Sequence, residues 1–187
     1  ARSDAVRIIT IHKSKGLEFP IVILADLARK MNMQDNASAV LTDEELLLGG
    51  NVVDLASRSY YHGLARRAII DRKTAQTVSE EMRVLYVAMT RAKEQLIMTS
   101  CSAHYGSRLK NLLLRLSDPL GPWVSAAVRQ PDEWILLAAL CRTESGALFA
   151  ECGPCVYSRV HQYPWLVTLQ NVSPAAPAAR GTETEET

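Results

Sequence analysis

The sequence lacks three features that would each assign it to a familiar class: long apolar runs, an excess of one charge, and a dense set of cysteines. Its longest apolar stretches, at about residues 21–27 and 134–141, are far shorter than the roughly 20 residues that a membrane-spanning helix needs. The sequence therefore excludes a membrane-spanning helix and predicts a soluble chain.

The charge balance and the cysteines exclude two further classes. The 21 Lys and Arg residues against 20 Asp and Glu residues give a net charge of +1, which is unlike a generally basic nucleic-acid-binding protein. Any contact with DNA must then come from local geometry. The four cysteines are scattered through the second half of the chain, which excludes a secreted disulfide scaffold and predicts a reducing cytoplasm.

Along its first half the chain carries an α/β pattern. A β-branched run at residues 6–11 predicts a buried strand, and the apolar run at residues 21–25 predicts a strand covered on both faces, as in a parallel sheet. Residues 28–61 are mixed in character and broken by a glycine pair at 49–50, so they predict no definite structure. A further strand is expected at residues 95–99.

Two helices are predicted before that last strand. The first begins at Leu64, where basic residues share one face. Thr77 and Glu80 match a capping box, so a separate second helix is expected at about residues 79–93. Its apolar stripe, of which Tyr86 is expected to be core, consists of Met82, Leu85, Tyr86 and Met89.

The remainder predicts a mainly helical extension. Short helices are expected at residues 108–116 and 134–140, and a strand or two at 156–167. We divide the chain into an α/β part at residues 1–100, an extension at 101–170, and a disordered or linker tail at 171–187, where proline, alanine and Thr-Glu repeats gather.

Chemistry-bearing side chains are concentrated in two segments. The first reads Thr-Ile-His-Lys-Ser-Lys-Gly-Leu-Glu-Phe at residues 10–19. It follows the first predicted strand, at the carboxyl edge of the expected sheet, where open α/β sheets bind ligands. On composition alone it also fits a surface turn. Its candidate ligand-binding residues are Thr10, His12, Lys15, Gly16 and Glu18.

The second segment, at residues 79–94, places Arg83 and Arg91 on a stripe beside the apolar one. Most such arginines are solvated or paired with a nearby glutamate. Arg91 has a sharper interpretation. A guanidinium near a transferred γ-phosphate neutralises the charge that develops there, which is the role of an arginine finger.

Together and in this order, the two segments resemble motifs V and VI of the superfamily 1A (UvrD/Rep-like) DNA helicases. The sequence around motif VI and the basic helix before it are most similar to the AddA family of helicase-nuclease subunits. Motif V is matched at Thr10, Ile11, His12, Ser14, Lys15, Gly16, Leu17, Glu18 and Phe19. Motif VI is matched at Glu80, Glu81, Arg83, Tyr86, Val87, Ala88, Thr90, Arg91 and Ala92.

This resemblance, over about residues 6–100, implies a partial RecA-like parallel sheet of the P-loop NTPase type, helicase domain 2A. It implies ATP-driven 3′ to 5′ translocation along DNA and unwinding of DNA in double-strand-break repair and recombination. The implied location is the bacterial cytoplasm. The implied partners are single-stranded DNA and the N-terminal motor domain 1A, and a second, AddB-like nuclease subunit is compatible with it. Residues 101–170 would connect toward a following domain.

The resemblance also implies roles for individual residues. Arg91 is expected to be the finger on the γ-phosphate of ATP, and Glu18 to lie near its ribose or phosphates, with Gly16 in the same loop. Thr10 and His12 are expected to face single-stranded DNA.

Three further residues are given roles in the same way. Lys15 would serve either the nucleotide or the DNA. Arg83 and Glu81 would hold motif VI in place.

No Gly-x-x-x-x-Gly-Lys-Ser/Thr occurs in these residues, and no carboxylate pair precedes motif V. The chain is therefore expected to supply the trans half of an ATP site, with Mg²⁺ held by the other half, and to be inactive alone. It is expected to hold no metal itself, since Cys152 and Cys155 form a C-x-x-C without a second pair.

Two alternatives stay open. One is a non-catalytic DNA- or partner-binding module derived from a helicase, against which the intact Arg91 and Glu18 speak. The other is a stand-alone repair helicase of the UvrD type.

Overall fold

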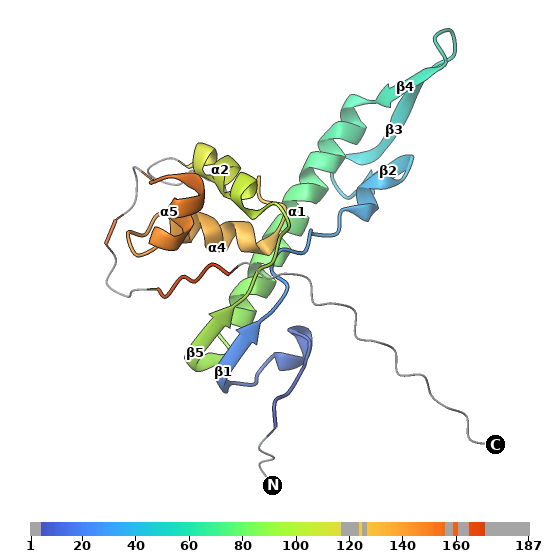
Figure 1. The fold of residues 1–187 in the computed structure, drawn as a ribbon. Coiled ribbons are helices and arrows are strands. Elements are labelled where there is room, and N and C mark those ends of the chain that lie inside the picture. Colours follow the sequence, from blue (N-terminus) through green and yellow to red (C-terminus); the bar gives the residue numbers. More distant parts are fainter. Residues whose placement is uncertain (1–4, 117–123, 125–126, 156–158, 161–164, 171–187) are drawn as a thin grey trace, which may run out of the picture.

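The computed structural model describes most of the chain (Figure 1). Within it, a long helix links a small parallel sheet, an antiparallel arm and a group of short helices. None of its helices is long and apolar enough to cross a membrane in the part of the chain described. The predicted tail at 171–187 lies outside that part, which consists of residues 5–116, 124, 127–155, 159–160 and 165–170.

The parallel sheet consists of β1 (Phe19–Leu24) and β5 (Ala92–Met98), which pair in parallel with Leu24 opposite Met98. Helix α1 (Leu64–Met89) precedes β5 in the long crossover that a parallel pair requires, and packs Leu85 against Leu24. The predicted α/β class and the strands expected at 21–25 and 95–99 are confirmed.

Two expectations about the sheet are wrong. Residues 6–11 form no strand, and Val6 is 93% exposed. A strand is held by backbone hydrogen bonds to a neighbour, and none of the described strands lies beside this segment. Strand β1 is also covered on one face only, since Ile21 and Ile23 are 54% and 60% exposed while Leu24 is buried.

Helix α1 is one continuous element where two helices were predicted. Thr77 caps nothing: its hydroxyl donates to the carbonyl of Lys73, one turn earlier in the same helix, at 3.0 Å. The helix ends at Met89, before the predicted end at residue 93. Tyr86, expected in the core, is 67% exposed, because the covered face of α1 runs through Leu85 instead.

The segment that predicted no structure forms a short 3-10 helix, η2 (Gln34–Ala37), and a three-stranded antiparallel sheet. We call the residues of this sheet, 40–62, the arm. Gly49 does not break the chain but lies inside a strand, where its backbone approaches α1. The strands, in the order β2-β3-β4, are β2 (Val40–Asp43), β3 (Leu47–Asp54) and β4 (Ser59–His62).

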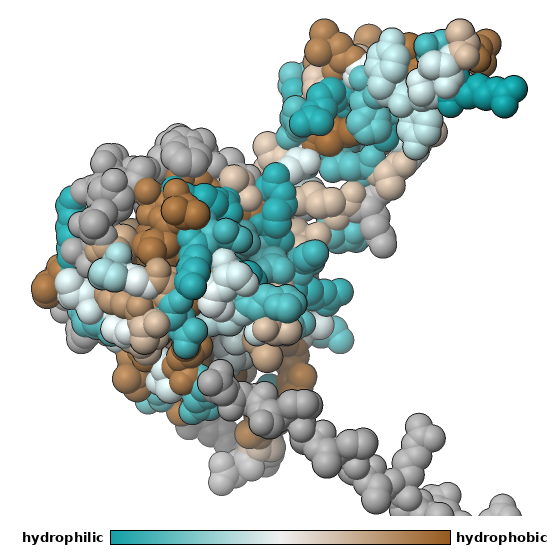
Figure 2. Space-filling model, turned by 45° about the horizontal axis from the view of Figure 1, so that its top comes forward, coloured by the Kyte–Doolittle hydropathy of each residue, from teal (hydrophilic) through white to brown (hydrophobic). Residues whose placement is uncertain are grey.

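Charged side chains of α1 fix the arm. Arg66 is buried and donates hydrogen bonds to the carbonyls of Asn36 and Ser38, which lead into β2. Further along the helix, Arg72 pairs with Asp43 and Glu45 at the β2–β3 turn. Figure 2 shows the arm standing clear of the rest of the molecule.

The extension forms a helical layer with its own core. The predicted helices are confirmed as α2 (Tyr105–Arg115) and α4 (Pro131–Leu140), and α5 (Gly146–Cys152) was not predicted. Of the strands expected at 156–167, the described residues show only an isolated bridge at Arg159. The core side chains, which include Val78 of α1, are chiefly Val78, Leu109, Leu112, Leu136, Leu140 and Leu148.

An ion pair in the interior joins the extension to the parallel sheet. Asp132, at the start of α4, is buried and pairs with Arg108 of α2 at 2.8 Å. Its other carboxylate oxygen accepts a hydrogen bond from Ser100, just after β5, and its backbone N–H donates to Leu27, just after β1. The carboxyl ends of both strands are thereby tied to the helices.

Gly49 offers a test of how the arm is attached. A Cβ atom at this position would lie 2.5 Å from Cα and 2.6 Å from N of Arg66, both backbone atoms that cannot turn aside. We expect Gly49→Ala to lower the free energy of unfolding by about 1–3 kcal/mol. Thermal unfolding of the chain measures this. Gly50→Ala is the matched control, since a Cβ there meets nothing within 4 Å, and an equal loss in both variants would contradict the prediction.

Candidate functional site at the amino ends of β1 and β5

The two segments singled out in the sequence meet where the parallel strands begin. Residues 10–18 lead into β1, Arg91 directly precedes β5, and Phe19 is the register partner of Ala92. The backbone N–H of Phe19 donates to the carbonyl of Arg91 at 2.9 Å. The site therefore lies at the amino edge of the described sheet. The expected position at a carboxyl edge depended on a strand at 6–11 that does not form.

Arg91 is held at the junction of α1 and β5. Its Nε donates to the carbonyl of Val87 at 3.0 Å, Nη1 to the carbonyl of Leu17 at 3.1 Å, and Nη2 to the hydroxyl of Thr90 at 3.3 Å. These contacts use three of the five N–H donors of a guanidinium. Among the described contacts, two donors are left for a ligand, on a side chain whose stem is already ordered.

A tight turn shapes the loop before β1. The 3-10 helix η1 (His12–Ser14) is closed by the buried Ser14, whose backbone N–H donates to Thr10 and whose hydroxyl donates to the carbonyl of Ile11 at 2.6 Å. Gly16 follows with a φ of +80°, a conformation that strains any residue with a side chain. A Cβ there would meet nothing within 4 Å, so the space beside Gly16 is open.

Glu18 pairs with Lys93, a residue that the sequence did not single out. Oε2 of Glu18 lies 2.9 Å from Nζ of Lys93, and both side chains are more than half exposed. The hydrogen bond from Lys93 and then its charge hold the pKa of the Glu18 carboxyl below its usual value, and Arg91 adds to this. The same contact raises the pKa of Lys93. Only the strand register brings these side chains together, so no sequence signal revealed the pair.

The residues expected to face DNA lie at the other end of this loop. Thr10, His12 and Lys15 are exposed on or beside η1. The Thr10 hydroxyl accepts a hydrogen bond from the backbone N–H of Lys13 at 3.4 Å. Within the described residues no hydrogen bond or ion pair joins Thr10, His12 or Lys15 to Arg91, so the loop carries them apart from Glu18.

Arg83 does not bridge motif VI to another element in the described contacts. It reaches Glu80 at 3.3 Å and Ser79 at 3.5 Å, both on α1. Cys152 lies at the end of α5, where burial raises the pKa of its thiol. Over the part of the chain that the structure describes, no three His, Cys, Asp or Glu side chains are grouped so that they could hold a metal ion.

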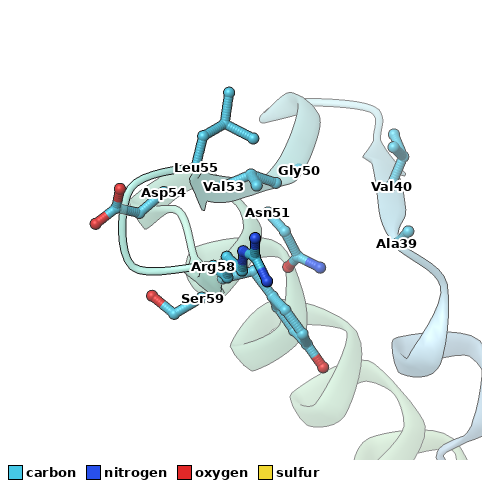
Figure 3. Close-up of a pocket in the computed structure, with 10 residues that line it drawn as sticks. Ala39, Val40, Gly50, Asn51, Val53, Asp54, Leu55, Arg58 and Ser59 are labelled. Atoms are coloured by element: carbon cyan, nitrogen blue, oxygen red, sulfur yellow. The ribbon is translucent and has the colours of Figure 1, made fainter.

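A concave surface on the arm has different chemistry. Figure 3 shows it, lined by residues of all three arm strands and of the turn between β3 and β4. Val53, Leu55 and Tyr60 make it largely apolar, and Arg58 is its single cation among the described lining residues. It lacks the cluster of donors that a triphosphate needs. The phosphate-binding potential lies at Arg91.

A sequence profile of the UvrD-like helicase C-terminal domain matches residues 1–103, which span the candidate site, the arm and α1. The chain belongs to this family. The helicase family's domain thus ends just before α2, and the extension lies beyond it.

Similarity to curated helicases extends past that boundary. An ATP-dependent helicase/nuclease subunit of Clostridium botulinum is 40% identical over 78% of the chain, and that of Heliobacterium modesticaldum is 45% identical over 75%. The protein of the same name from Acetivibrio thermocellus is 50% identical over 51% of the chain. The chain spans only 12%, 10% and 8%, respectively, of the length of these relatives.

The Glu18–Lys93 pair predicts a titration. We expect the Glu18 carboxyl, followed by NMR, to titrate below its usual value of 4.5, and Lys93→Gln to move the midpoint upward. Because the folded-state pKa is lowered, the pair stabilises the fold above the unfolded-state pKa, and this contribution is lost as the pH falls through the folded-state value. Lys15→Gln is the control, since Lys15 is in the same loop and forms no described ion pair with Glu18. An unchanged midpoint in Lys93→Gln would refute the pairing.

Proposed function

We propose that this chain is part of an ATP-driven motor that moves along single-stranded DNA from 3′ to 5′ and unwinds duplex DNA in double-strand-break repair. The observation that carries the proposal is the position of Arg91. It projects from the end of α1 beside the loop of motif V, with its stem fixed and donors left over. Membership in the UvrD-like helicase family and relatives named as ATP-dependent helicases support it.

The residues present fit one half of a nucleotide site. Arg91 would neutralise charge on the γ-phosphate during its transfer, without donating a proton or forming a bond. Gly16 leaves open space in which a phosphate could approach the backbone, and Glu18 lies close enough to reach a ribose hydroxyl. The chemistry that Mg²⁺ supplies, bridging the phosphates, would come from the facing half in domain 1A.

The geometry also supports a link between the nucleotide and DNA. Arg91 donates directly to the carbonyl of Leu17, inside the loop whose other end carries Thr10 and His12. A shift of the finger when the cleft closes on ATP would therefore move the loop that we propose to contact the DNA backbone. Lys15 lies between the two ends and could contact either ligand.

The partners of the whole protein follow from its relatives. The relatives are named as helicase/nuclease subunits, so each is one component of an enzyme that also cleaves nucleic acid. We propose that the protein containing this chain likewise works with a second, AddB-like nuclease subunit in the bacterial cytoplasm.

Replacement of the proposed finger tests the function. In the complete motor that carries this chain, Arg91→Ala should lower kcat for DNA-stimulated ATP hydrolysis by about 10³-fold or more, because no other cation would replace the guanidinium at the γ-phosphate. Arg91→Lys keeps the charge but loses the planar fork, so it should recover only part of the rate. Steady-state ATPase assays measure both.

The control is Arg67→Ala near the other end of α1, where Arg67 is exposed and paired with Asp71. It should retain kcat within about twofold, since exposed pairs of this kind contribute little. If Arg91→Ala hydrolyses ATP as fast as the unmodified motor, the finger assignment is wrong. The alternative of a non-catalytic module derived from a helicase would then be favoured.

A further inference from the structure

Three charged side chains stand in a row where β1 and β5 begin. Glu18 directly precedes β1, Arg91 directly precedes β5, and Lys93 is the second residue of β5. Side chains two residues apart along a strand point to the same side, so Lys93 and Arg91 flank one carboxylate. Lys93 lies 2.9 Å from that carboxylate, and the charge of Arg91 also acts on it.

Such an arrangement sets two cations in competition for one anion. A guanidinium and a carboxylate bind through two parallel hydrogen bonds, the strongest pairing open to an arginine in a protein. An unoccupied Glu18 would therefore be a direct rival to a phosphate for the fork of Arg91. In the structure Arg91 instead donates to the backbone of Leu17 and Val87, and Glu18 is bound by Lys93.

We propose that Lys93 is a positioning residue that holds the Glu18 carboxylate away from Arg91, so that the guanidinium keeps its remaining donors for the γ-phosphate. This inference rests on the proposed function, because it presumes that Arg91 acts on ATP. Lys93 contacts neither the nucleotide nor the DNA in this role and acts only through Glu18.

The exposure of the pair is consistent with this role. Both side chains are 58% exposed, and an ion pair of that kind contributes little to folding. Its effect is therefore directional: it decides which of two neighbouring cations the carboxylate binds. Lysine suits the task because its compact ammonium can satisfy one carboxylate oxygen without the fork that recognition of a phosphate needs.

A double-mutant cycle in the complete motor tests the proposal, with kcat and the KM for ATP measured separately. Lys93→Met frees Glu18, and we expect kcat to fall about two- to fivefold, the size of effect that an exposed ion pair can exert. Lys93→Arg retains a cation for Glu18 and should restore most of that loss. Made on top of Glu18→Gln, which removes the rival carboxylate, Lys93→Met should cause no further fall in kcat.

The outcomes separate the possible explanations. An equal fall in kcat with and without Glu18→Gln would mean that Lys93 is merely structural and would overturn the proposal, as would an unchanged kcat in Lys93→Met. Arg91→Ala is measured in parallel. If it also leaves kcat unchanged, the proposed function itself fails; if it abolishes hydrolysis while Lys93→Met has no effect, only the role of Lys93 is refuted.

Discussion

The packing of α1 against β1 is the constraint on which the rest of the structure depends. Leu85 and Ala88 of the helix are buried against Leu24 and Leu27, and this contact fixes where the last turn of α1 stands relative to the sheet. The helix is 26 residues long and unbroken, so the same contact also orients the arm, held by its first turns, and the extension, which packs against its middle. Arg91 emerges where this helix ends.

Local sequence patterns predicted the parts of the fold whose cause is local. The apolar run of β1, the amphipathic helix through Leu85 and the helices α2 and α4 each follow from residues close together in the chain. The arm could not be predicted this way. Its middle strand passes close to α1 only because Gly49 has no side chain, and a glycine pair in a sequence is more often the sign of a turn. Continuity of α1 was missed because Thr77 can either cap a helix or bond back within one.

The site was predictable to the extent that it is written in two contiguous motifs. Arg91, Glu18 and Gly16 were found from sequence and meet at one sheet edge, although not the edge expected. Lys93 was not found, because its partner lies 75 positions earlier (93 − 18 = 75) and the two meet through strand register alone. The wrong strand at residues 6–11 has a similar origin. Its β-branched residues favour a strand, but a strand forms only beside a neighbour.

Gly16 illustrates how backbone geometry carries function that side-chain motifs do not state. Its φ of +80° closes the turn in which the N–H of Leu17 donates to Ser14 at 2.9 Å. That turn aims the carbonyl of Leu17 at Nη1 of Arg91. Any side chain is tolerated at the carbonyl-bearing position, whereas the glycine before it is constrained by the turn. The glycine of motif V is therefore required to orient the finger of motif VI, a reason that is independent of close approach to a phosphate.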